Sequence, residues 1–193
     1  MKNLIKLLFI IPAFLMFNCG GSDDDNDNDG NNSNTGDNVM MLGDLEYDLE
    51  GGDLTYYGGG DDCDYNFDVN LATSISGDGC DAETMGAVIY FEMWTSNQNH
   101  LDDGYYTFDD GNLYCLNGTI SYADYDNGDG NWIGISTLSV SVDRSGSIYE
   151  ISWDGEADDG TMVMGSYEGS LEFCDYSDED LDSNNSSKRR SKK

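Results

Sequence analysis

Apolar and polar residues alternate with a period of two through most of this chain, and no other feature limits the fold as strongly. Residues 65–71 read YNFDVNL, and residues 137–142 read TLSVSV. Successive side chains of a strand point to opposite faces of a sheet, so this pattern indicates antiparallel strands with one face in a core and the other in water. The sequence has no helical spacing of comparable length. We therefore predict an all-β protein.

Turn residues separate the alternating segments at short intervals. Gly51-Gly52 predicts a two-residue hairpin, and residues 126–131 and 143–146 predict further turns. Connections this short favour a meander, so we expect a single antiparallel β-sandwich or flattened β-barrel of about nine strands. Gly165 and Gly169 lie in the last strand and indicate bulges or bends there. The expected strands span residues 44–50, 53–57, 64–72, 86–95, 104–108, 118–124, 135–143, 147–154 and 161–174.

The N-terminus carries the features of an export signal. Lys2 and Lys6 precede an apolar run from Leu7 to Phe17, which is too short to span a bilayer at ~20 residues and matches the h-region of a signal peptide. Asn18-Cys19-Gly20 completes a sequence that resembles the lipobox of type II signal peptides, although residues 16 and 18 depart from the usual Leu and small residue. The resemblance implies cleavage before Cys19 and acylation of that cysteine, which then anchors the mature chain to a membrane.

The segment Ser22 to Asp25 resembles the serine-plus-acidic tract of surface lipoproteins from the Bacteroidota. This resemblance implies a lipoprotein on the outer membrane that faces the exterior. A periplasm-facing anchor, with the acidic tract as a solvated spacer, is the alternative. Residues 26–38 contain no apolar side chain and predict a disordered tether. We expect a signal peptide at 1–18, a tether at 19–43, one β domain at 44–175 and a disordered tail with a basic end at 176–193.

The mature chain is strongly acidic. The sequence has 39 Asp and Glu residues against eight Lys and Arg residues, of which two lie in the signal peptide and five lie at 188–193. All the acidic residues follow Cys19, so the body has only Arg144 against 39 acids and a net charge of −38. Such a field repels nucleic acid phosphates and anionic lipids, which argues against nucleic acid as a partner. It suits a soluble surface, or one that recruits divalent cations.

Four cysteines remain after Cys19. An even number of cysteines in an exported protein predicts two disulfides, with three connectivities that the sequence does not separate. Free buried thiols are the alternative. No Cys-x-x-Cys pair occurs, so a zinc or redox site has little support. The four residues are Cys63, Cys80, Cys115 and Cys174.

The sequence offers little for catalysis. Its single histidine, His100, stands in a polar segment between two expected strands, where a solvated loop residue is the simplest interpretation. The sequence contains no Gly-x-Ser-x-Gly elbow, no phosphate-binding glycine loop and no His-Glu-x-x-His motif. Paired carboxylates serve glycoside hydrolysis, but 39 acidic residues make close pairs inevitable. We predict that the protein is not an enzyme, and a small hydrolase is the least favoured function.

One loop has the composition of a calcium site. Residues 124–131 read DYDNGDGN and place several oxygen ligands close together. The EF-hand template fails, because Gly128 and Asp129 stand where that loop needs a ligand and a glycine. A calcium site of another kind is the remaining candidate, and a Gly-rich turn on an acidic surface is the alternative; no other cofactor is expected. The candidate ligands are Asp124, Asp126 and Asp129.

Two tryptophans are candidates for stacking on sugar rings. Trp94 shares the parity of Glu92 rather than that of its apolar neighbours, and Trp132 follows a loop, so we predict that both are exposed. Trp153 has the apolar parity and is predicted to lie in the core. The expected function is a lipid-anchored, non-catalytic structural or binding protein with no identified ligand. The alternative is a glycan-binding accessory lipoprotein of a polysaccharide uptake system, with a polysaccharide or a cell-surface protein as its partner.

Overall fold

The computed structural model describes residues 38–60, 63–108 and 115–177. Most of these residues lie in strands, and their one helical element is a short 3-10 turn, η1 (Gly79–Asp81). No helix among them is long and apolar enough to cross a membrane. The strands are β1 (Val39–Leu42), β2 (Leu45–Asp48), β3 (Gly51–Gly59), β4 (Tyr65–Ser76), β5 (Glu83–Thr95), β6 (Gly104–Phe108), β7 (Thr119–Asn127), β8 (Trp132–Ser145), β9 (Ile148–Ala157), β10 (Met162–Ser170) and β11 (Glu172–Asp175).

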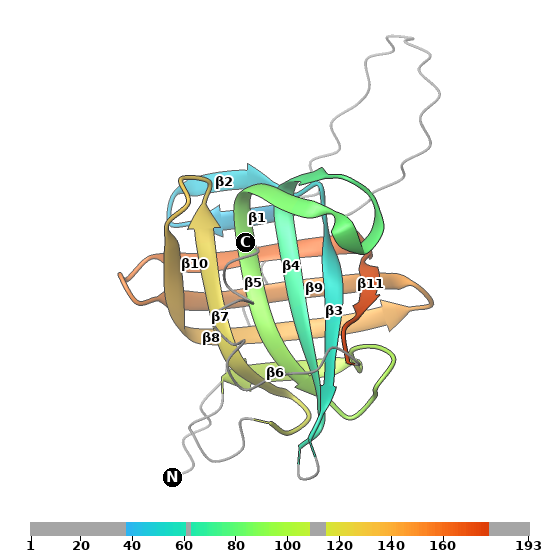
Figure 1. Cartoon of the computed structure of the whole chain (residues 1–193). Coiled ribbons are helices and arrows are strands. Elements are labelled where there is room, and N and C mark those ends of the chain that lie inside the picture. The colour runs from blue at the N-terminus through green and yellow to red at the C-terminus, as the bar shows by residue number, and fades with distance from the viewer. Residues whose placement is uncertain (1–37, 61–62, 109–114, 178–193) are drawn as a thin grey trace, which may run out of the picture. The chain divides into compact units, whose positions relative to one another are not determined.

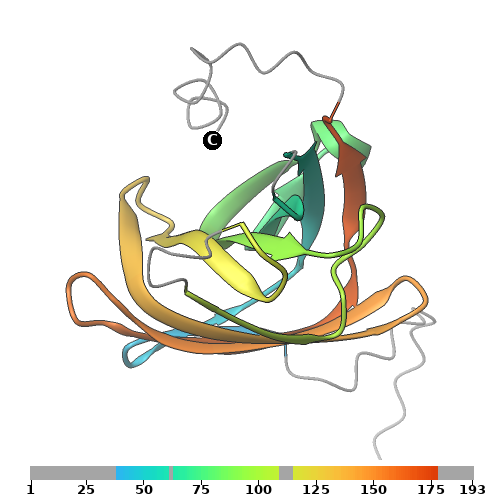
Figure 2. The same ribbon diagram turned by 90° about the horizontal axis from the view of Figure 1, so that it is seen from below.

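All eleven strands belong to one sheet, in the order β11-β3-β4-β5-β7-β6-β8-β9-β10-β1-β2. The sheet curls into a half-barrel, so that β3, β4, β5 and β7 lie across from β8, β9 and β10 (Figures 1 and 2). We call these two parts the front half and the back half. The strands of the two halves cross each other in Figure 1.

The core fills the space inside the curl. It contains apolar side chains from alternate positions of both halves, including Phe67, Val69 and Leu71 of β4 and Val140 and Val142 of β8, all almost completely buried. The rings of Phe91 on β5 and Trp153 on β9 meet edge to face, with 5.6 Å between their centroids. Because β5 and β9 belong to opposite halves, this contact joins them. The all-β prediction and the core assignment of Trp153 are confirmed.

Gly165 makes room for Trp153. The two residues are directly opposite on β10 and β9. A Cβ atom at Gly165 would overlap the Trp153 ring and the carbonyl oxygen of Val39. The pairing of β9 with β10 is regular through this region, so Gly165 marks no bulge. Gly169 likewise lies under the ring of Tyr167. Both glycines are therefore explained by aromatic rings that pack across them, which corrects the expected bulges.

The prediction of a single antiparallel β-sandwich or flattened β-barrel of about nine strands is confirmed only in part. The sheet is single and curled, but it has eleven strands, and two of its pairings, β3 with β11 and β6 with β7, are parallel. β7 and β8 pair only near their hairpin, through Asp124 to Asp126. Beyond that point the two strands separate, and β6 pairs with β8 between them. Alternation predicts which residues form strands but not which strands pair, so the sequence did not indicate this insertion or the mixed sheet.

The last expected strand, residues 161–174, is two strands. β10 pairs with β9 and β1, whereas β11 pairs with β3 at the other end of the sheet. Leu171, which is 8% exposed, separates them at the point where the chain passes from one end of the curl to the other. The expected Gly51-Gly52 hairpin is also wrong, because both glycines lie in β3, opposite Ala72 and Leu71 of β4.

The folded sheet begins before residue 44. β1 is apolar throughout, with Met40 and Leu42 buried, and it pairs with both β2 and β10. It therefore lies in the stretch 19–43 that we expected to be a tether. The signal peptide, Cys19, most of that stretch and residues 178–193 lie outside the described residues.

Two disulfides are present, as the cysteine count predicted. Cys63 is bonded to Cys115, which links the segment before β4 to the segment before β7. Cys80 is bonded to Cys174, which links η1 to the edge strand β11. β11 has four residues and one pairing partner, so this covalent bond holds a short edge strand that would otherwise fray easily.

The close contact at Gly165 predicts that Gly165→Ala destabilises the domain. The added methyl group would push the Trp153 ring from its place against Phe91, so the free energy of unfolding should fall by roughly 1–3 kcal/mol in a denaturant titration. Ser152→Ala, at an exposed position of β9, is the matched control and should change it by less than ~0.5 kcal/mol. Equal stability of the two variants would contradict the role assigned to Gly165.

Candidate functional site

The outward side of the front half carries an ordered set of polar side chains. Strand alternation directs Leu54, Val69 and Phe91 into the core, and their neighbours point the opposite way. The register aligns these neighbours in two adjacent rows across β3, β4, β5 and β7. We call the eight residues the polar face; the first row is Asp53, Asn70, Tyr90 and Asp124, and the second is Thr55, Asp68, Glu92 and Tyr122.

Much of the polar face is withdrawn from water. Asp68 is 8% exposed, Asp124 7% and Tyr90 6%, although none of them points into the core. On the back half, by contrast, the residues that point outward, such as Glu150 and Asp154, are exposed. Burying a carboxylate is costly unless hydrogen bonds or opposite charges compensate it. The outward polar side chains of the front half are therefore largely buried, whereas those of the back half are exposed to solvent.

Hydrogen bonds fix the carboxylates of this face. Asp53 Oδ1 accepts from Asn70 Nδ2 at 2.9 Å and from Thr55 Oγ1 at 3.0 Å. The Tyr122 hydroxyl donates to Asp124 Oδ2 at 2.9 Å. These donors orient the carboxylates of Asp53 and Asp124, so this part of the face has a fixed arrangement.

A second chain of hydrogen bonds holds Glu92. Trp94 Nε1 donates to Ser121 Oγ at 2.9 Å, and Ser121 Oγ lies 2.9 Å from Glu92 Oε1, to which it donates. Asn66 Nδ2 also donates to Glu92 Oε1, at 3.4 Å. Glu92 is directly opposite Asp68 on the neighbouring strand. Like charges in such a pair repel each other.

Tyr90 reports the environment at the centre of the face. Burial raises the pKa of its hydroxyl well above the ordinary value of 10.0, and the negative charges of Asp68 and Glu92 raise it further. A hydrogen bond with Asp68 acts in the same direction. The neutral phenol is therefore strongly preferred. The centroid of its ring lies 6.0 Å from that of Tyr122, so the two rings pack against each other across β5 and β7.

The structure places both candidate tryptophans on the outward side of the front half. Trp94 is half-buried at one end, opposite Asn66. Trp132 is 37% exposed at the other end, opposite Asp126. The polar face lies between them, so the two rings do not form a single platform. The sequence indicated their outward direction but not their separation.

The candidate calcium ligands have other roles in the described structure. Asp126 Oδ1 accepts from the backbone N–H groups of Gly128, Asp129 and Gly130, at 2.8–3.1 Å, and so closes the turn between β7 and β8. Asp129 Oδ1 accepts from the N–H of Asn131. Asp124 belongs to the polar face. Within the described ranges no group of three His, Cys, Asp or Glu side chains is placed to hold a metal ion, and calcium binding at these three residues stays a prediction.

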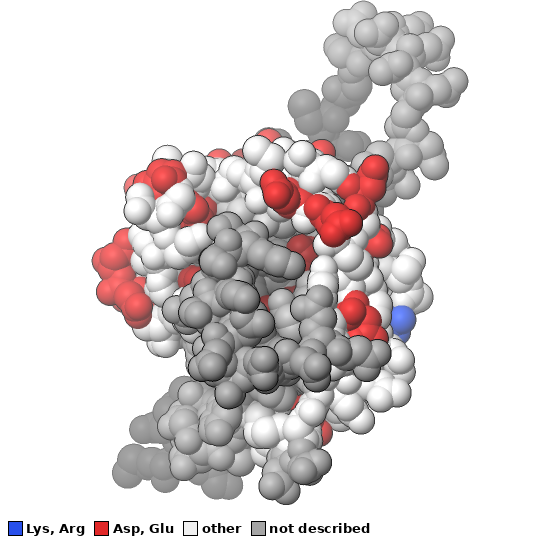
Figure 3. Space-filling view, in the orientation of Figure 1, with Lys and Arg blue, Asp and Glu red and all other residues white. Residues whose placement is uncertain are grey.

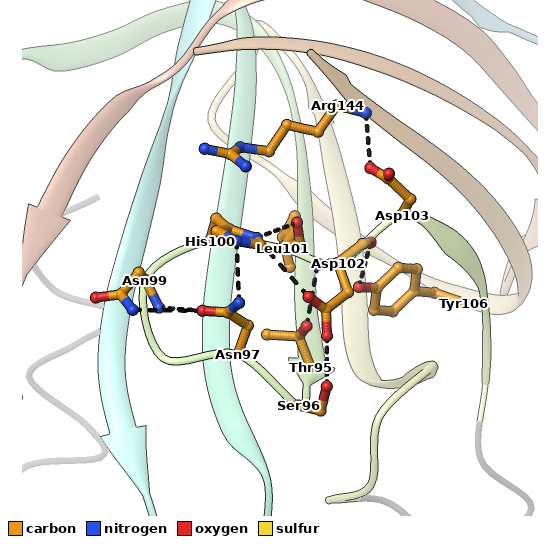
Figure 4. A network of polar contacts seen from close by, with 10 residues as sticks. All are labelled: Thr95, Ser96, Asn97, Asn99, His100, Leu101, Asp102, Asp103, Tyr106 and Arg144. Carbon is orange, nitrogen blue, oxygen red and sulfur yellow. Dashed lines mark hydrogen bonds and ion pairs between the residues drawn. The ribbon is translucent and has the colours of Figure 1, made fainter. Parts of the chain in front are cut away.

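His100 belongs to a network within the loop between β5 and β6 (Figure 4). Its Nε2 lies 2.9 Å from Asn97 Nδ2, and its Nδ1 lies 2.9 Å from the carbonyl oxygen of Leu101. Asp102 lies 3.8 Å from Nδ1 and receives a hydrogen bond from Ser96. Both ring nitrogens are thus engaged by residues of the same loop.

Contacts with the core and with β8 also hold this loop in place. Leu101 is completely buried, and the Tyr106 hydroxyl donates to the carbonyl oxygen of Asp102 at 2.8 Å. Asp103 accepts from the backbone N–H of Arg144 on β8. The Arg144 guanidinium itself lies over the Tyr149 ring, 5.8 Å from its centroid. These contacts order the loop, so a structural role accounts for the polar side chains around His100.

Acidic residues dominate the described surface. In the view of Figure 3, Asp and Glu side chains are spread over the surface, and a single basic patch is visible. Arg144 is the one Lys or Arg side chain that the described residues contain.

Comparison with protein-family models, with curated proteins and with solved structures finds no match to this chain.

Sequence reasoning missed the polar face because it treated outward polar residues as a wet surface. One signal was present: residues 87–91 read AVIYF without alternation. A continuous run of this kind indicates a strand that is buried on both sides. Together with Tyr122 at an outward position of β7, this run could have predicted that the outward side of the front half is also partly buried.

Proposed function

We propose that this chain is a lipid-anchored, non-catalytic binding protein of the cell surface, and that it binds through the polar face. The anchor is supported by the apolar run Leu7–Phe17, by Cys19 at its edge and by the export tract from Ser22. The two disulfides fit an exported protein, because such bonds persist in oxidising compartments.

The observation that carries the binding role is the burial of an organised set of polar side chains outside the core. Asp68 and Asp124 do not belong to the hydrophobic core, and burying their carboxylates costs free energy. Side chains held by hydrogen bonds in a fixed arrangement are preorganised for a ligand, so less entropy is lost on binding. A recognition surface accounts for this arrangement better than a purely structural role does.

A non-catalytic role is supported by the environments of the groups that catalysis would use. The ring nitrogens of His100 are engaged within its own loop. One shallow hollow beside the front half, lined by Gly52, Asp53 and Glu172 among others, has a volume of about 170 Å³, and a second on the back half, lined by Arg144, Ile148 and Glu150 among others, has about 320 Å³. The first is smaller than most small-molecule sites, and the second lies at their lower limit.

Glycan binding is the second candidate, and the two tryptophans favour it. Trp94 and Trp132 flank the polar face, which also carries the half-buried Tyr122 and the amide of Asn70. Aromatic rings with neighbouring amides and carboxylates match the stacking faces and hydroxyl groups of a sugar. The acidic charge of the face selects neutral or cationic polysaccharides over anionic ones.

The anchor predicts the mass and the location of the mature protein. In a Gram-negative host that processes lipoproteins, membrane-extracted protein should begin at residue 19 and carry acyl chains, and Cys19→Ala should prevent both processing and acylation. Protease added to intact cells should digest the β domain if the lipoprotein faces the exterior. Digestion only after permeabilisation would place it on the periplasmic side, and a soluble protein with unmodified Cys19 would refute the anchor.

Glycan binding predicts a fluorescence response that depends on an outward tryptophan. Soluble neutral polysaccharides such as dextran or xyloglucan should change the tryptophan emission of the wild-type protein, while anionic alginate should not. Trp132→Ala should remove the change and lower the unfolding free energy by less than ~1 kcal/mol, because this ring is partly exposed. Trp153→Ala, the buried control, should cost ~3–5 kcal/mol. A panel without any response rejects the glycan candidate and leaves the polar face as a surface for another partner.

A further inference from the structure

We infer that the outward side of β1 and β10 holds a thioether site for a soft monovalent metal ion, Cu⁺, formed by Met41, Met162 and Met164. The site lies on strands that do not carry the polar face, so the inference is independent of the proposed function. It rests on the register of β1 with β10, on the exposure of the three methionines and on the chemistry of sulfur ligands.

The strand register brings the three methionines together. Met41 of β1 is directly opposite Met164 of β10, and Met162 lies two positions from Met164 on the same strand. Opposite residues of an antiparallel pair have Cα atoms ~4.5–5.5 Å apart, and diagonal neighbours are ~7–8 Å apart. Methionine has an unbranched side chain with three rotatable bonds. The three sulfur atoms can therefore meet at one ion above the sheet.

All three side chains point away from the core. Met40 and Val163, their chain neighbours, are completely buried in the core, so alternation directs the adjacent residues outward. Met162 is 48% exposed and Met164 is 43% exposed, and Met41 is half-buried. A metal ion can therefore reach the sulfur atoms from solvent without any movement of the backbone.

The methionines of the mature chain are concentrated at this place. Methionine is most often a buried residue, and two of the six that follow Cys19 are completely buried. Of the four that reach the surface, three form this group, and the fourth is Met85 on β5. On the neighbouring strand β9 the outward positions Glu150, Ser152 and Asp154 are polar and exposed. The three thioethers thus interrupt a face that is otherwise polar. The six methionines are Met40, Met41, Met85, Met93, Met162 and Met164.

The sulfur atoms decide which cation this surface selects. A thioether is a soft, uncharged ligand, and among biological metals it favours Cu⁺, whereas Ca²⁺ and Mg²⁺ require sets of oxygen ligands. Three exposed carboxylates surround the group, each directly opposite one of the methionines on β2 or β9. They can stay hydrated and still raise the local concentration of cations and balance the charge of a bound ion. These carboxylates are Glu46, Asp154 and Glu156.

Equilibrium dialysis with Ag⁺ tests the inference. Ag⁺ has the charge and the ligand preference of Cu⁺ and needs no reductant that could open the disulfides. The full mature chain, with Cys19→Ala so that no free thiol competes, should bind one Ag⁺ in chloride-free buffer with a Kd in the micromolar range or below. Replacing all three methionines of the site by Leu should abolish this binding. The melting temperature should stay close to that of the parent chain, because Leu conserves the apolar volume.

Met85→Leu is the matched control, because Met85 is also exposed but lies alone on β5. This variant should bind Ag⁺ as the parent chain does. A parent chain that binds no Ag⁺ would overturn the inference. Equal binding by the triple Leu variant would overturn it too, because Leu keeps the apolar surface and removes only the sulfur.

The methyl NMR signals of the methionines locate the ion. One equivalent of Ag⁺ should shift the signals of Met41, Met162 and Met164 and leave that of Met85 in place. A thioether has no proton to lose, so these shifts should persist when the pH is lowered to about 5, where a site at His100 would weaken as the imidazole gains its proton. Shifts that vanish at the lower pH, or that spare the three methionines, would place the ion elsewhere and contradict the inference.

Discussion

The two halves of the curled sheet are joined inside the core by an aromatic contact. Phe91 of β5 and Trp153 of β9 meet inside the curl, and Gly165 leaves the space in which the Trp153 ring lies. With this contact, strands that are distant in the sheet order enclose a common core. The segment through Leu171 then joins β10 on the back half to β11 at the edge of the sheet beside β3, and the bond between Cys80 and Cys174 holds β11 there.

The two halves of the sheet use their outward faces differently. The back half exposes residues such as Glu150 and Asp154, where water screens the charges. The front half withdraws Asp68 and Asp124 from water and holds its acidic side chains with neutral donors. Electrostatic interactions are stronger in such an environment than on the water-exposed back half.

Residue alternation was sufficient to predict an all-β domain, most strands and the core position of Trp153, because these depend on local periodicity. Strand pairing depends on contacts between distant segments, so the insertion of β6 and the parallel pairing of β11 were not predicted. The cysteine count predicted two disulfides but not their connectivity. The polar face was missed because outward polarity in the sequence is the same for Asp68, which is buried, as for Asp154, which is exposed.

The claim that the front half carries a polar surface closed to water is tested most directly by the ionisation of Tyr90. The phenolate absorbance of the wild-type protein, minus that of Tyr90→Phe, isolates this residue during an alkaline titration. The account predicts ionisation well above pH 10.0, because burial and the charges of Asp68 and Glu92 raise the pKa in the folded state. Since the folded-state pKa exceeds the unfolded one, this group's contribution to stability should be complete below pH 10 and decline as the pH rises toward the folded-state pKa. A difference spectrum that titrates near pH 10 would show an open, hydrated face and contradict the account.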